Sequence, residues 1–194
     1  MYIYRSMYYK NAISLFGKNI MDQKYQKRLS SGANNTVIAL NEQEAAKLFG
    51  GDTRSDIGSE AEKMKFANSI NELVVNFIRL DFDAETSSDM IVMERLYPID
   101  YRCYETEKRE LWFEVFEEEV KKLHQNGFVH RDLKRPADLS GEIYDNVLLT
   151  NRGLRLIDVG ISALKSQVGD NMFQKFVEEE LKELAEFKEY FLNR

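Results

Sequence analysis

The sequence predicts an α+β protein in which a mainly β N-terminal half precedes a mainly helical C-terminal half. Short β-rich runs separated by polar breaks occur between residues 36 and 93. Two long patterns typical of amphipathic helices follow, with one small hairpin pattern between them. Pro98 interrupts any regular element between the two halves, so we expect a boundary near residues 95–98.

The composition is that of one globular domain, or of one domain with two small lobes. The 194 residues are 43% hydrophobic and 12% aromatic, which suffices for a packed core. The net charge of −6 argues against nucleic acid as the main partner, because binding to a phosphate backbone requires a basic face. We interpret the acidic runs Glu117–Glu119 and Glu178–Glu180 as solvated helix faces.

The cysteine content and the hydropathy indicate a protein of a reducing compartment. Cys103 is the only cysteine, which excludes a disulfide within the chain and, without a Cys/His cluster, makes a structural zinc site improbable. No apolar run is long enough to span a membrane, and the N-terminus has no uninterrupted apolar segment typical of a secretory signal. We therefore expect a cytoplasmic protein without a membrane span.

The first regular feature is a predicted β-hairpin. Thr36–Leu40 is a short β-rich run, and a polar break at 41–44 separates it from a second run, Ala45–Phe49. The glycine pair Gly50-Gly51 then stops the second strand.

A helix and two further strands complete the N-terminal half. The helix is expected over residues 58–70, with Ser59 as its N-cap. We expect the strands over 73–80 and 90–93, with an acidic turn at 81–89 between them.

The C-terminal half contains two predicted long helices, one over residues 107–125 that Gly127 terminates and one over about 171–192. A second hairpin is expected from Val147–Leu149 and Leu154–Ile157. The apolar face of the first helix comprises Trp112, Val115, Phe116, Val120 and Leu123. The apolar face of the second comprises Phe173, Phe176, Val177, Leu181, Leu184, Phe187 and Phe191.

Two polar motifs follow apolar runs in this half. His130-Arg131-Asp132-Leu133-Lys134 follows the pair Phe128-Val129, and Asp158-Val159-Gly160 ends the run that begins at Leu154. Each motif alone is compatible with an ordinary turn. Together and in this order they indicate a catalytic centre, in which His130 is expected to be structural and packed under the loop.

These motifs resemble the catalytic core of the eukaryotic-type protein kinases. Residues 130–134 are similar to the H-R-D-L-K catalytic loop, and Asn146–Leu149 is similar to the asparagine-headed strand after it. Residues 158–160 are similar to the D-F-G motif, with valine in place of phenylalanine. Earlier in the chain, Ala45-Ala46-Lys47 resembles the strand with the nucleotide-binding lysine, and Met93–Leu96 resembles the hinge that holds adenine.

The resemblance covers roughly residues 29–162 and implies a two-lobed protein-kinase-like fold. The small antiparallel-sheet N-lobe would be residues 1–95, including an N-terminal extension over 1–28, and the reduced helical C-lobe would be residues 96–194. The implied activity is phosphoryl transfer from ATP with Mg²⁺ to a serine or threonine hydroxyl of a protein. Minimal kinases are known among bacterial and effector-type members of this superfamily, which implies a cytoplasmic protein or one delivered to a host cytoplasm.

The resemblance also assigns residues to nucleotide binding. Lys47 would pair with the α- and β-phosphates and be held by a helix glutamate, for which Glu60 fits best and Glu62 is the alternative. The remaining nucleotide-binding positions are Gly32 and Val37 near the phosphates, and Glu94 and Leu96 in the hinge.

The catalytic and metal-binding roles go to four residues near the second lobe's motifs. Asn146 and Asp158 would hold magnesium, because a hard cation prefers oxygen ligands. Asp132 would orient a hydroxyl and accept its proton. Lys134 would neutralise charge on the γ-phosphate, and its spacing from Asp132 is that of the serine/threonine protein kinases.

The sequence also departs from the family. Of the three glycine-loop positions, Ser30, Gly32 and Asn35, only the middle one is glycine. The step from the catalytic aspartate to Asn146 is longer than in the family, and its extra residues, within Arg135–Asp145, are expected to form a surface loop.

Only 34 residues follow Gly160, without an A-P-E motif or a long activation segment, so Arg131 has no obvious phosphate to pair with. Two alternatives therefore stay open. One is a pseudokinase that acts as an interaction module, and the other is a small-molecule or lipopolysaccharide kinase of the same superfamily. If the chain phosphorylates itself, Ser162 and Ser166 are the candidate acceptors, because they lie just past the metal-binding motif.

Overall fold

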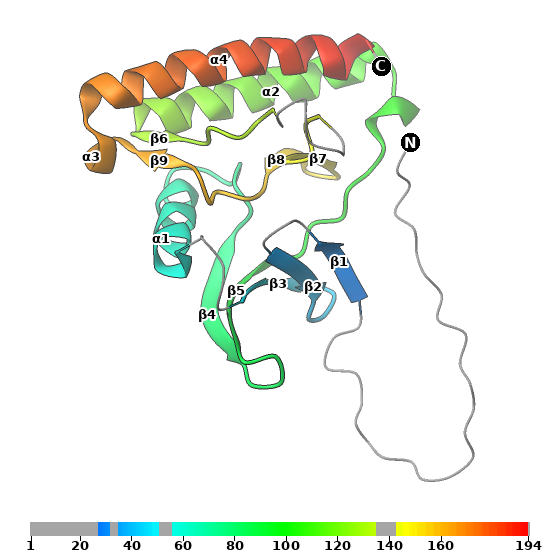
Figure 1. The fold of residues 1–194 in the computed structure, drawn as a ribbon. Coiled ribbons are helices and arrows are strands. Elements are labelled where there is room, and N and C mark those ends of the chain that lie inside the picture. The colour runs from blue at the N-terminus through cyan, green and yellow to red at the C-terminus, as the bar shows by residue number, and fades with distance from the viewer. Residues whose placement is uncertain (1–26, 32–34, 51–55, 135–142, 194) are drawn as a thin grey trace.

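The structure is a computed structural model that describes residues 27–31, 35–50, 56–134 and 143–193. It confirms the predicted α+β class (Figure 1). A five-stranded antiparallel sheet and helix α1, Ile57–Asn68, make up the N-terminal half. At the opposite end two long helices run side by side, and two small two-stranded sheets lie between them and the rest of the molecule.

The five-stranded sheet has the spatial order β1-β2-β3-β5-β4. The predicted hairpin at residues 36–49 is confirmed as β2 and β3, which pair antiparallel. Strand β1 could not be predicted from the hydrophobic pattern, because its five residues, KRLSS, include a single apolar side chain. The strand bounds are Lys27–Ser31 for β1, Asn35–Ala39 for β2, Glu44–Phe49 for β3, Phe77–Asp83 for β4 and Ser88–Glu94 for β5.

The strand predicted at 73–80 is wrong in its first half. Leu73, Val74 and Val75 are buried, but they do not pair with β5. Val74 instead forms an isolated parallel bridge with Leu156, and the Leu156 N–H donates to the Leu73 carbonyl at 2.8 Å. A continuous apolar run is typical both of a buried strand and of a buried connection, so the pattern alone could not separate them.

The N-cap of α1 is Asp56, and the prediction of Ser59 is wrong. Asp56 has extended backbone with ψ of 111°, and its Oδ1 accepts the N–H groups of Gly58 at 2.8 Å and Ser59 at 3.2 Å. An N-cap residue must lie outside the helical φ/ψ region so that its side chain can reach back to these free N–H groups. Ser59 lies inside the first turn and is one of the residues that are capped.

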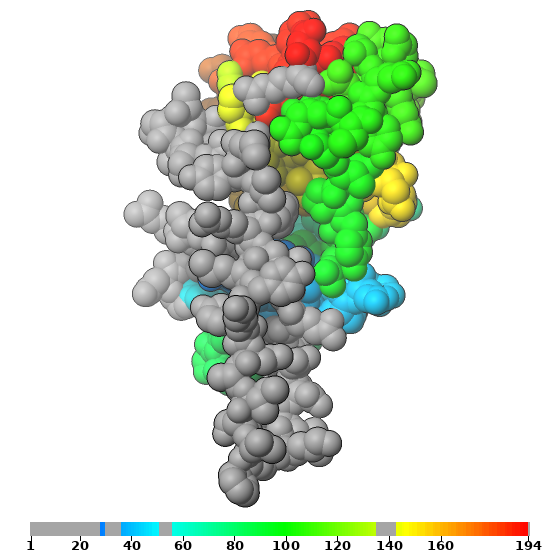
Figure 2. Space-filling model, turned by 90° about the vertical axis from the view of Figure 1, so that its right-hand side faces the viewer, coloured from blue at the N-terminus to red at the C-terminus, as the bar shows by residue number. Residues whose placement is uncertain are grey.

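The two long helices, α2 over Thr106–Gln125 and α4 over Asp170–Asn193, confirm the predicted spans. They contact each other along one end of the molecule, where Figure 2 shows the green and red segments packed together. Within the described residues, none of the helices has the length and the apolar character needed to cross a membrane.

The predicted apolar faces of these helices are wrong at one position each. Val115 is 61% exposed and Leu181 is 38% exposed. Phe113 and Glu180 are buried instead, because α2 packs against both α4 and the β-hairpin beside it. An aromatic cluster joins the two helices, with ring centroids 4.8 to 6.3 Å apart, among Phe113, Phe116, Tyr144, Phe187, Tyr190 and Phe191.

Two short strand pairs position the motif residues. The predicted second hairpin is confirmed as β7, Val147–Thr150, and β8, Gly153–Leu156. Strand β6, Phe128–Val129, pairs with β9, Ala163–Leu164, and so brings the segment after β6 beside the segment before β9. The remaining described elements are short, a 3₁₀ turn at Tyr101–Cys103 and α3 at Lys165–Val168.

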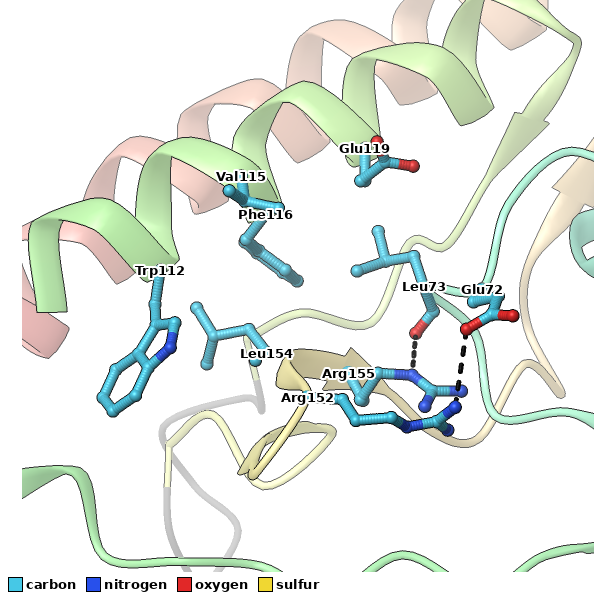
Figure 3. A pocket seen from close by; sticks show the side chains of 10 residues that line it. Glu72, Leu73, Trp112, Val115, Phe116, Glu119, Arg152, Leu154 and Arg155 are labelled. Atoms are coloured by element: carbon cyan, nitrogen blue, oxygen red, sulfur yellow. Dashed lines mark hydrogen bonds and ion pairs between the residues drawn. The ribbon is translucent and has the colours of Figure 1, made fainter. Parts of the chain in front are cut away.

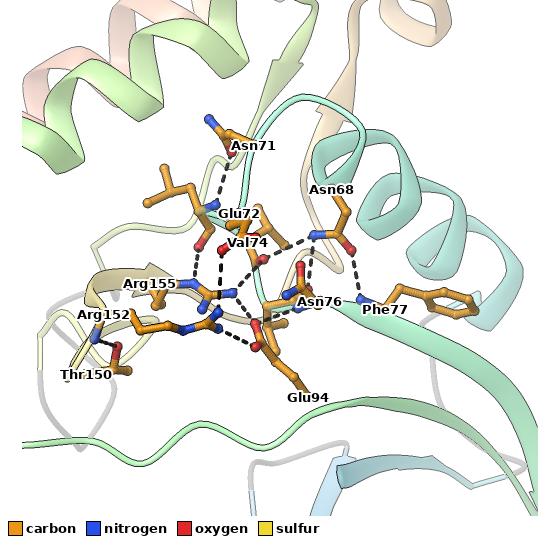
Figure 4. A network of polar contacts seen from close by, with 12 residues as sticks. Asn68, Asn71, Glu72, Val74, Asn76, Phe77, Glu94, Thr150, Arg152 and Arg155 are labelled. Carbon is orange, nitrogen blue, oxygen red and sulfur yellow. Dashed lines mark hydrogen bonds and ion pairs between the residues drawn. The ribbon is translucent and has the colours of Figure 1, made fainter. Parts of the chain in front are cut away.

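A polar network ties the end of β5 to the β7–β8 hairpin (Figure 4). Arg155, only 3% exposed, donates to the carbonyls of Leu73 and Val74 at 3.3 Å and pairs with the Glu94 carboxylate. The exposed Arg152 pairs with the other Glu94 oxygen at 2.6 Å. Burial lowers the pKa of the Arg155 guanidinium, and the Glu94 charge opposes this effect. The network therefore holds a buried cation between the two halves of the chain.

Beside this network lies a hollow of about 260 Å³ between α2 and the hairpin (Figure 3). Apolar side chains line most of it, among them Trp112, Phe116 and Leu154. Arg152 and Arg155 form one polar rim, and Glu119 on α2 lies on the other side.

The two arginines give a matched test of this network. We expect Arg155→Met to lower the free energy of unfolding by about 3 kcal/mol, because breaking a buried ion pair leaves a desolvated partner behind. Arg152→Met should cost at most about 1 kcal/mol, because its side chain is 48% exposed. Urea unfolding of both variants measures the difference, and equal costs would contradict the assignment of Arg155 as the buried partner.

Candidate functional site

Lys47, Glu60 and Asp158 meet at the centre of the candidate site. Lys47 lies on β3, Glu60 on α1 and Asp158 just after β8. The Lys47 Nζ donates to Glu60 Oε1 at 2.7 Å and to Asp158 Oδ1 at 2.8 Å. The structure thus brings together three predicted site residues that are up to 111 positions apart. Glu62, the alternative to Glu60, is exposed and lies 3.5 Å from Gln167.

Burial and charge compete within this cluster. Burial lowers the pKa of Lys47, but the Asp158 and Glu60 carboxylates outweigh it and hold the pKa above its ordinary value. For Asp158, Lys47 outweighs the effect of burial and holds the pKa low. For Glu60 burial prevails and raises the pKa. Its Oε2 is buried without a hydrogen-bond partner among the described residues. The Lys47 charge is therefore balanced chiefly by Asp158.

A second cluster joins Asp132 to Asn146. The Asn146 Nδ2 donates to both the carbonyl and the Oδ2 of Asp132, each at 2.9 Å. Asn146 reaches this position although 14 residues separate the two, and most of the intervening loop, residues 135–142, lies outside the described residues. Burial raises the pKa of Asp132, and the charge of Asp158 adds to this effect, which indicates that the two clusters are neighbours.

The segment around these aspartates has unusual backbone geometry. Arg131 has a φ of +69° and Asp158 a φ of +59°, in the left-handed region that side chains other than glycine rarely adopt. Such conformations cost on the order of 1–3 kcal/mol each and persist where the surrounding structure enforces them. Both Arg131 and Asp158 belong to the motifs predicted from the sequence.

His130 has the structural role that we predicted. It is fully buried, its Nε2 lies 2.9 Å from the Ile157 carbonyl, and its own carbonyl accepts the Ser162 hydroxyl at 3.0 Å. These contacts make Ser162 a poor phosphate acceptor, because its side chain is buried and already hydrogen-bonded. That candidate is wrong for the conformation described, whereas Ser166 is exposed.

Arg131 has partners within the chain in place of a phosphate. Its guanidinium stacks on the Phe176 ring at 3.8 Å from the centroid, and its Nη1 donates to the Ile161 carbonyl at 3.0 Å. A guanidinium is well suited to such stacking because it is planar and weakly hydrated. The arginine therefore joins the loop at 131–134 to α4 and to the segment after Gly160.

A row of three glutamates on α4 supports the loop at 131–134. Glu180 accepts the Arg131 N–H and also lies 2.8 Å from His124 Nε2, and Glu183 lies near the backbone of Leu133 and Lys134. Burial raises the pKa of Glu183. The spacing of three places these residues on one side of the helix. The third member is Glu186, which pairs with the Lys134 Nζ.

The contacts of this row differ from what the sequence led us to expect for Glu180 and for Lys134. Glu180 is only 3% exposed, so the interpretation of Glu178–Glu180 as a fully solvated face is wrong at that residue. Lys134, expected to meet a γ-phosphate, is partly exposed and paired with Glu186. Charge runs usually lie in solvent, and the only signal for another role was the repeated spacing of three, Glu180, Glu183 and Glu186.

Lys63 is a second residue that the sequence did not reveal. It lies on α1, is 8% exposed, and donates from Nζ to the Gly160 carbonyl at 2.9 Å. Burial lowers the pKa of Lys63, with the Glu60 carboxylate opposing the effect. Lys63 thus ties α1 to the Asp158–Gly160 segment, one turn from the contact that Glu60 makes.

The remaining predicted nucleotide-binding residues lie around β2, β3 and β5. Val37 is partly buried and faces Lys47 across the β2–β3 pair. The Glu94 carboxylate is engaged by Arg152 and Arg155, and its backbone N–H donates to the Asn76 carbonyl at 2.9 Å. Leu96 packs partly buried against the main core. Gly32 lies outside the described residues.

Comparison with known proteins does not assign the chain to a family. No family model matches the chain, and no curated protein matches it. Within residues 27–31, 35–50, 56–134 and 143–193, no three or more His, Cys, Asp and Glu side chains are grouped as they are in a preformed metal site. A functional assignment therefore rests on the arrangement of the residues described above.

The raised pKa of Asp132 gives a prediction about stability. Folding raises the pKa of the Asp132 carboxyl group. The folded protein therefore loses stability as the pH rises from the unfolded to the folded pKa of this group. We therefore expect Asp132→Asn to be more stable than the unmodified protein at neutral pH. The difference should vanish near about pH 3, where Asp132 is protonated in both states.

Asp100→Asn is the matched control. Arg102 lowers the pKa of the exposed Asp100, so this substitution should leave stability unchanged or reduce it at neutral pH. Thermal unfolding across the pH range measures both variants. A less stable Asp132→Asn at neutral pH would contradict the desolvation of Asp132.

Proposed function

We propose that this chain is a minimal protein-kinase-like phosphotransferase that uses ATP and Mg²⁺ to phosphorylate a serine or threonine hydroxyl of a protein. The observation that carries the proposal is the cluster in which Lys47 contacts both Glu60 and Asp158 at 2.7 and 2.8 Å. A strand lysine held by a helix glutamate, and an aspartate just past a hairpin, are the parts that phosphoryl transfer in this superfamily requires.

The two-lobed fold is part of the same proposal. The N-lobe, residues 1–95, contains the five-stranded sheet and α1, and the C-lobe, residues 96–194, contains α2, α4 and the two short strand pairs. Lys47 and Glu60 belong to the first and Asp132, Asn146 and Asp158 to the second. The proposed site thus takes residues from both sides of the segment around Pro98.

Nucleotide binding in this proposal depends on residues of both lobes. Lys47 donates to the α- and β-phosphates, while Glu60 keeps its ammonium group in place. By the resemblance, we assign Glu94 and Leu96 to the contact with adenine, and Gly32 and Val37 to the phosphates.

The donor set near Asp158 fits magnesium. The Asp158 side chain is 48% exposed, and Asn146 uses its Nδ2 on Asp132, which leaves the amide oxygen for a cation. Oxygen ligands of this kind are what Mg²⁺ prefers. Magnesium, when bound, would neutralise phosphate charge. Asn146 and Asp158 would hold it.

Asp132 acts on the acceptor hydroxyl. Its Oδ2 is oriented by Asn146, and its raised pKa brings it closer to the pH at which a general base works well. It orients the hydroxyl and accepts its proton as the oxygen bonds to the γ-phosphorus, while the bond from that phosphorus to the β–γ bridging oxygen breaks and ADP leaves. Lys134 exchanges its contact with Glu186 for the γ-phosphate, which the exposure of both side chains permits.

Two observations favour a pseudokinase as the second candidate. Ser30 and Asn35 stand at two of the three glycine-loop positions, and Lys134 is paired with Glu186. A small-molecule or lipopolysaccharide kinase is less well supported, because the Asp132 and Lys134 spacing is the protein-kinase form.

The nucleotide-binding part is tested with Lys47→Met. Loss of a charge-assisted contact with phosphate should weaken binding of ATP with Mg²⁺ by about tenfold to a hundredfold, as titration calorimetry of the folded variant would measure. Lys65→Met, on the exposed side of α1, is the control and should leave the affinity unchanged. ATP binding by Lys47→Met at the unmodified affinity would overturn the assignment of Lys47.

The catalytic part is tested with Asp132→Asn. We expect phosphate transfer to fall by about 10²- to 10⁴-fold while ATP affinity stays within twofold or so, because a general base acts on turnover and not on ground-state binding. Labelled ATP with the chain alone and with a lysate measures transfer. An unmodified protein that binds ATP but transfers no phosphate would support the pseudokinase.

A further inference from the structure

Strand β4 is an open edge of the five-stranded sheet, at the outer side in Figure 1. Its residues from Ile78 to Phe82 are all exposed, and no strand within the described residues pairs with its outer side. Ile78, Leu80 and Phe82 are 41%, 48% and 54% exposed. An edge of this kind presents unpaired backbone N–H and C=O groups, together with apolar side chains, to a further strand.

The two faces of β4 have different chemistry. Leu80 is opposite Ile91 of β5, which belongs to the main core, and so lies on the side of the sheet that carries α1. Arg79 is opposite Val92, which belongs to the smaller cluster on the other face. Asp81 shares that face with Arg79, because side chains alternate along a strand. Both charged side chains are exposed, at 43% and 44%.

The sequence of β4 is complementary to itself in one register. Two copies of a strand can pair antiparallel about a two-fold axis that is perpendicular to the sheet. Residues that face each other across the pair must lie on the same face of the sheet. The axis therefore lies level with one residue, which faces its own copy in the other strand. An axis at Arg79 places arginine opposite arginine, and an axis at Asp81 places aspartate opposite aspartate. An axis at Phe82 places Asp81 opposite Asp83. An axis at Leu80 places Arg79 opposite Asp81 on both sides of the axis.

We propose that β4 pairs with β4 of a second copy of this chain, antiparallel and centred on Leu80. The sheet then continues across the two-fold axis as ten strands, five from each copy. Leu80 faces its own symmetry mate and Arg79 faces Asp81 of the other copy, whereas Phe82 lies opposite the irregular part of β4 between Phe77 and Arg79. The proposal is independent of the proposed function, since it uses none of the residues of the phosphotransferase site.

Known energies suggest a concentration-dependent dimer. Charges on an edge strand usually oppose strand addition, but here their signs favour one register. Arg79 already contacts Glu44 at 2.7 Å and Asp81 at 3.4 Å within its own chain, so Asp81 of the second copy would be its third carboxylate. Exposed ion pairs contribute little individually, and the backbone ladder and the burial of Leu80 and Phe82 add to them. A contact of one strand is small, which implies a dimer in exchange with monomer.

Disulfide trapping in the full chain tests the register directly. With the exposed Cys103 replaced by serine, Leu80→Cys should form a covalent dimer under mild oxidation. Facing residues of an antiparallel pair have Cα atoms about 4.5 to 5.5 Å apart, which a disulfide can bridge. Phe82→Cys is the control, because its sulfur would lie about 13 Å along the strand from its symmetry mate. Equal cross-linking of the two variants would overturn the register.

Charge reversal tests the complementarity. In sedimentation velocity over a range of concentrations, Arg79→Asp and Asp81→Arg should each weaken the dimer, by about tenfold or more for two lost pairs. The double variant Arg79→Asp/Asp81→Arg should restore it, because the pairs are re-formed with exchanged signs. Circular dichroism checks that each variant is folded.

Three results would overturn the proposal. One is an unmodified chain that stays monomeric at all concentrations without cross-linking of Leu80→Cys. Another is a dimer that neither charge reversal affects, which would place the interface elsewhere. The third is protection of the Leu80→Cys thiol from alkylation in a monomer, which would mean that another segment of the same chain covers β4.

Discussion

The buried charge of Lys47 is the constraint on which the arrangement of the chain depends. An ammonium group at 5% exposure is stable only with carboxylates at hydrogen-bond distance. Glu60 and Asp158 supply them, one from α1 and one from the segment after β8. Because both must reach the same nitrogen, the helix, the sheet and the β7–β8 hairpin are fixed relative to one another. Lys63 reinforces the same junction through the Gly160 carbonyl.

The opposite side of the site is fixed by α4. The loop at 131–134 has little regular structure of its own, and one of its residues has a strained backbone. Glu180 accepts the Arg131 N–H and Glu186 pairs with Lys134, so that a single helix holds both ends of the loop that contains Asp132. As a result, three acidic side chains of α4 lie close together, and burial raises the pKa of one of them, Glu183.

Local periodicity was enough to predict much of the fold. Both long helices and both predicted hairpins are confirmed, because each pattern repeats over several residues and ends at a glycine or a polar turn. The pairing of Lys47 with Glu60 was also predictable, since the choice between Glu60 and Glu62 depends on which side of one helix faces the sheet.

The failures have a common physical cause. Glu180 and Lys63 are charged residues whose burial depends on partners distant in the sequence, an N–H of the loop and the carbonyl of Gly160. Leu73–Val75 resembles a strand because a buried connection needs the same apolar side chains. No pattern within a single element contains this information, because it belongs to contacts between elements.

The position of Trp112 has a practical consequence. It is the only tryptophan of the chain, and it lies where α2 meets the β7–β8 hairpin, edge-on to Tyr104 at 5.0 Å and beside Lys108. Indole emission responds to the hydration of the ring, so intrinsic fluorescence reports selectively on this seam. A change in the five-stranded sheet would alter the emission if it is transmitted through the contacts between the two halves, among them the bridge between Val74 and Leu156 and the pairing of Glu94 with Arg155. The chain therefore carries its own optical probe of the mechanical coupling between its two halves.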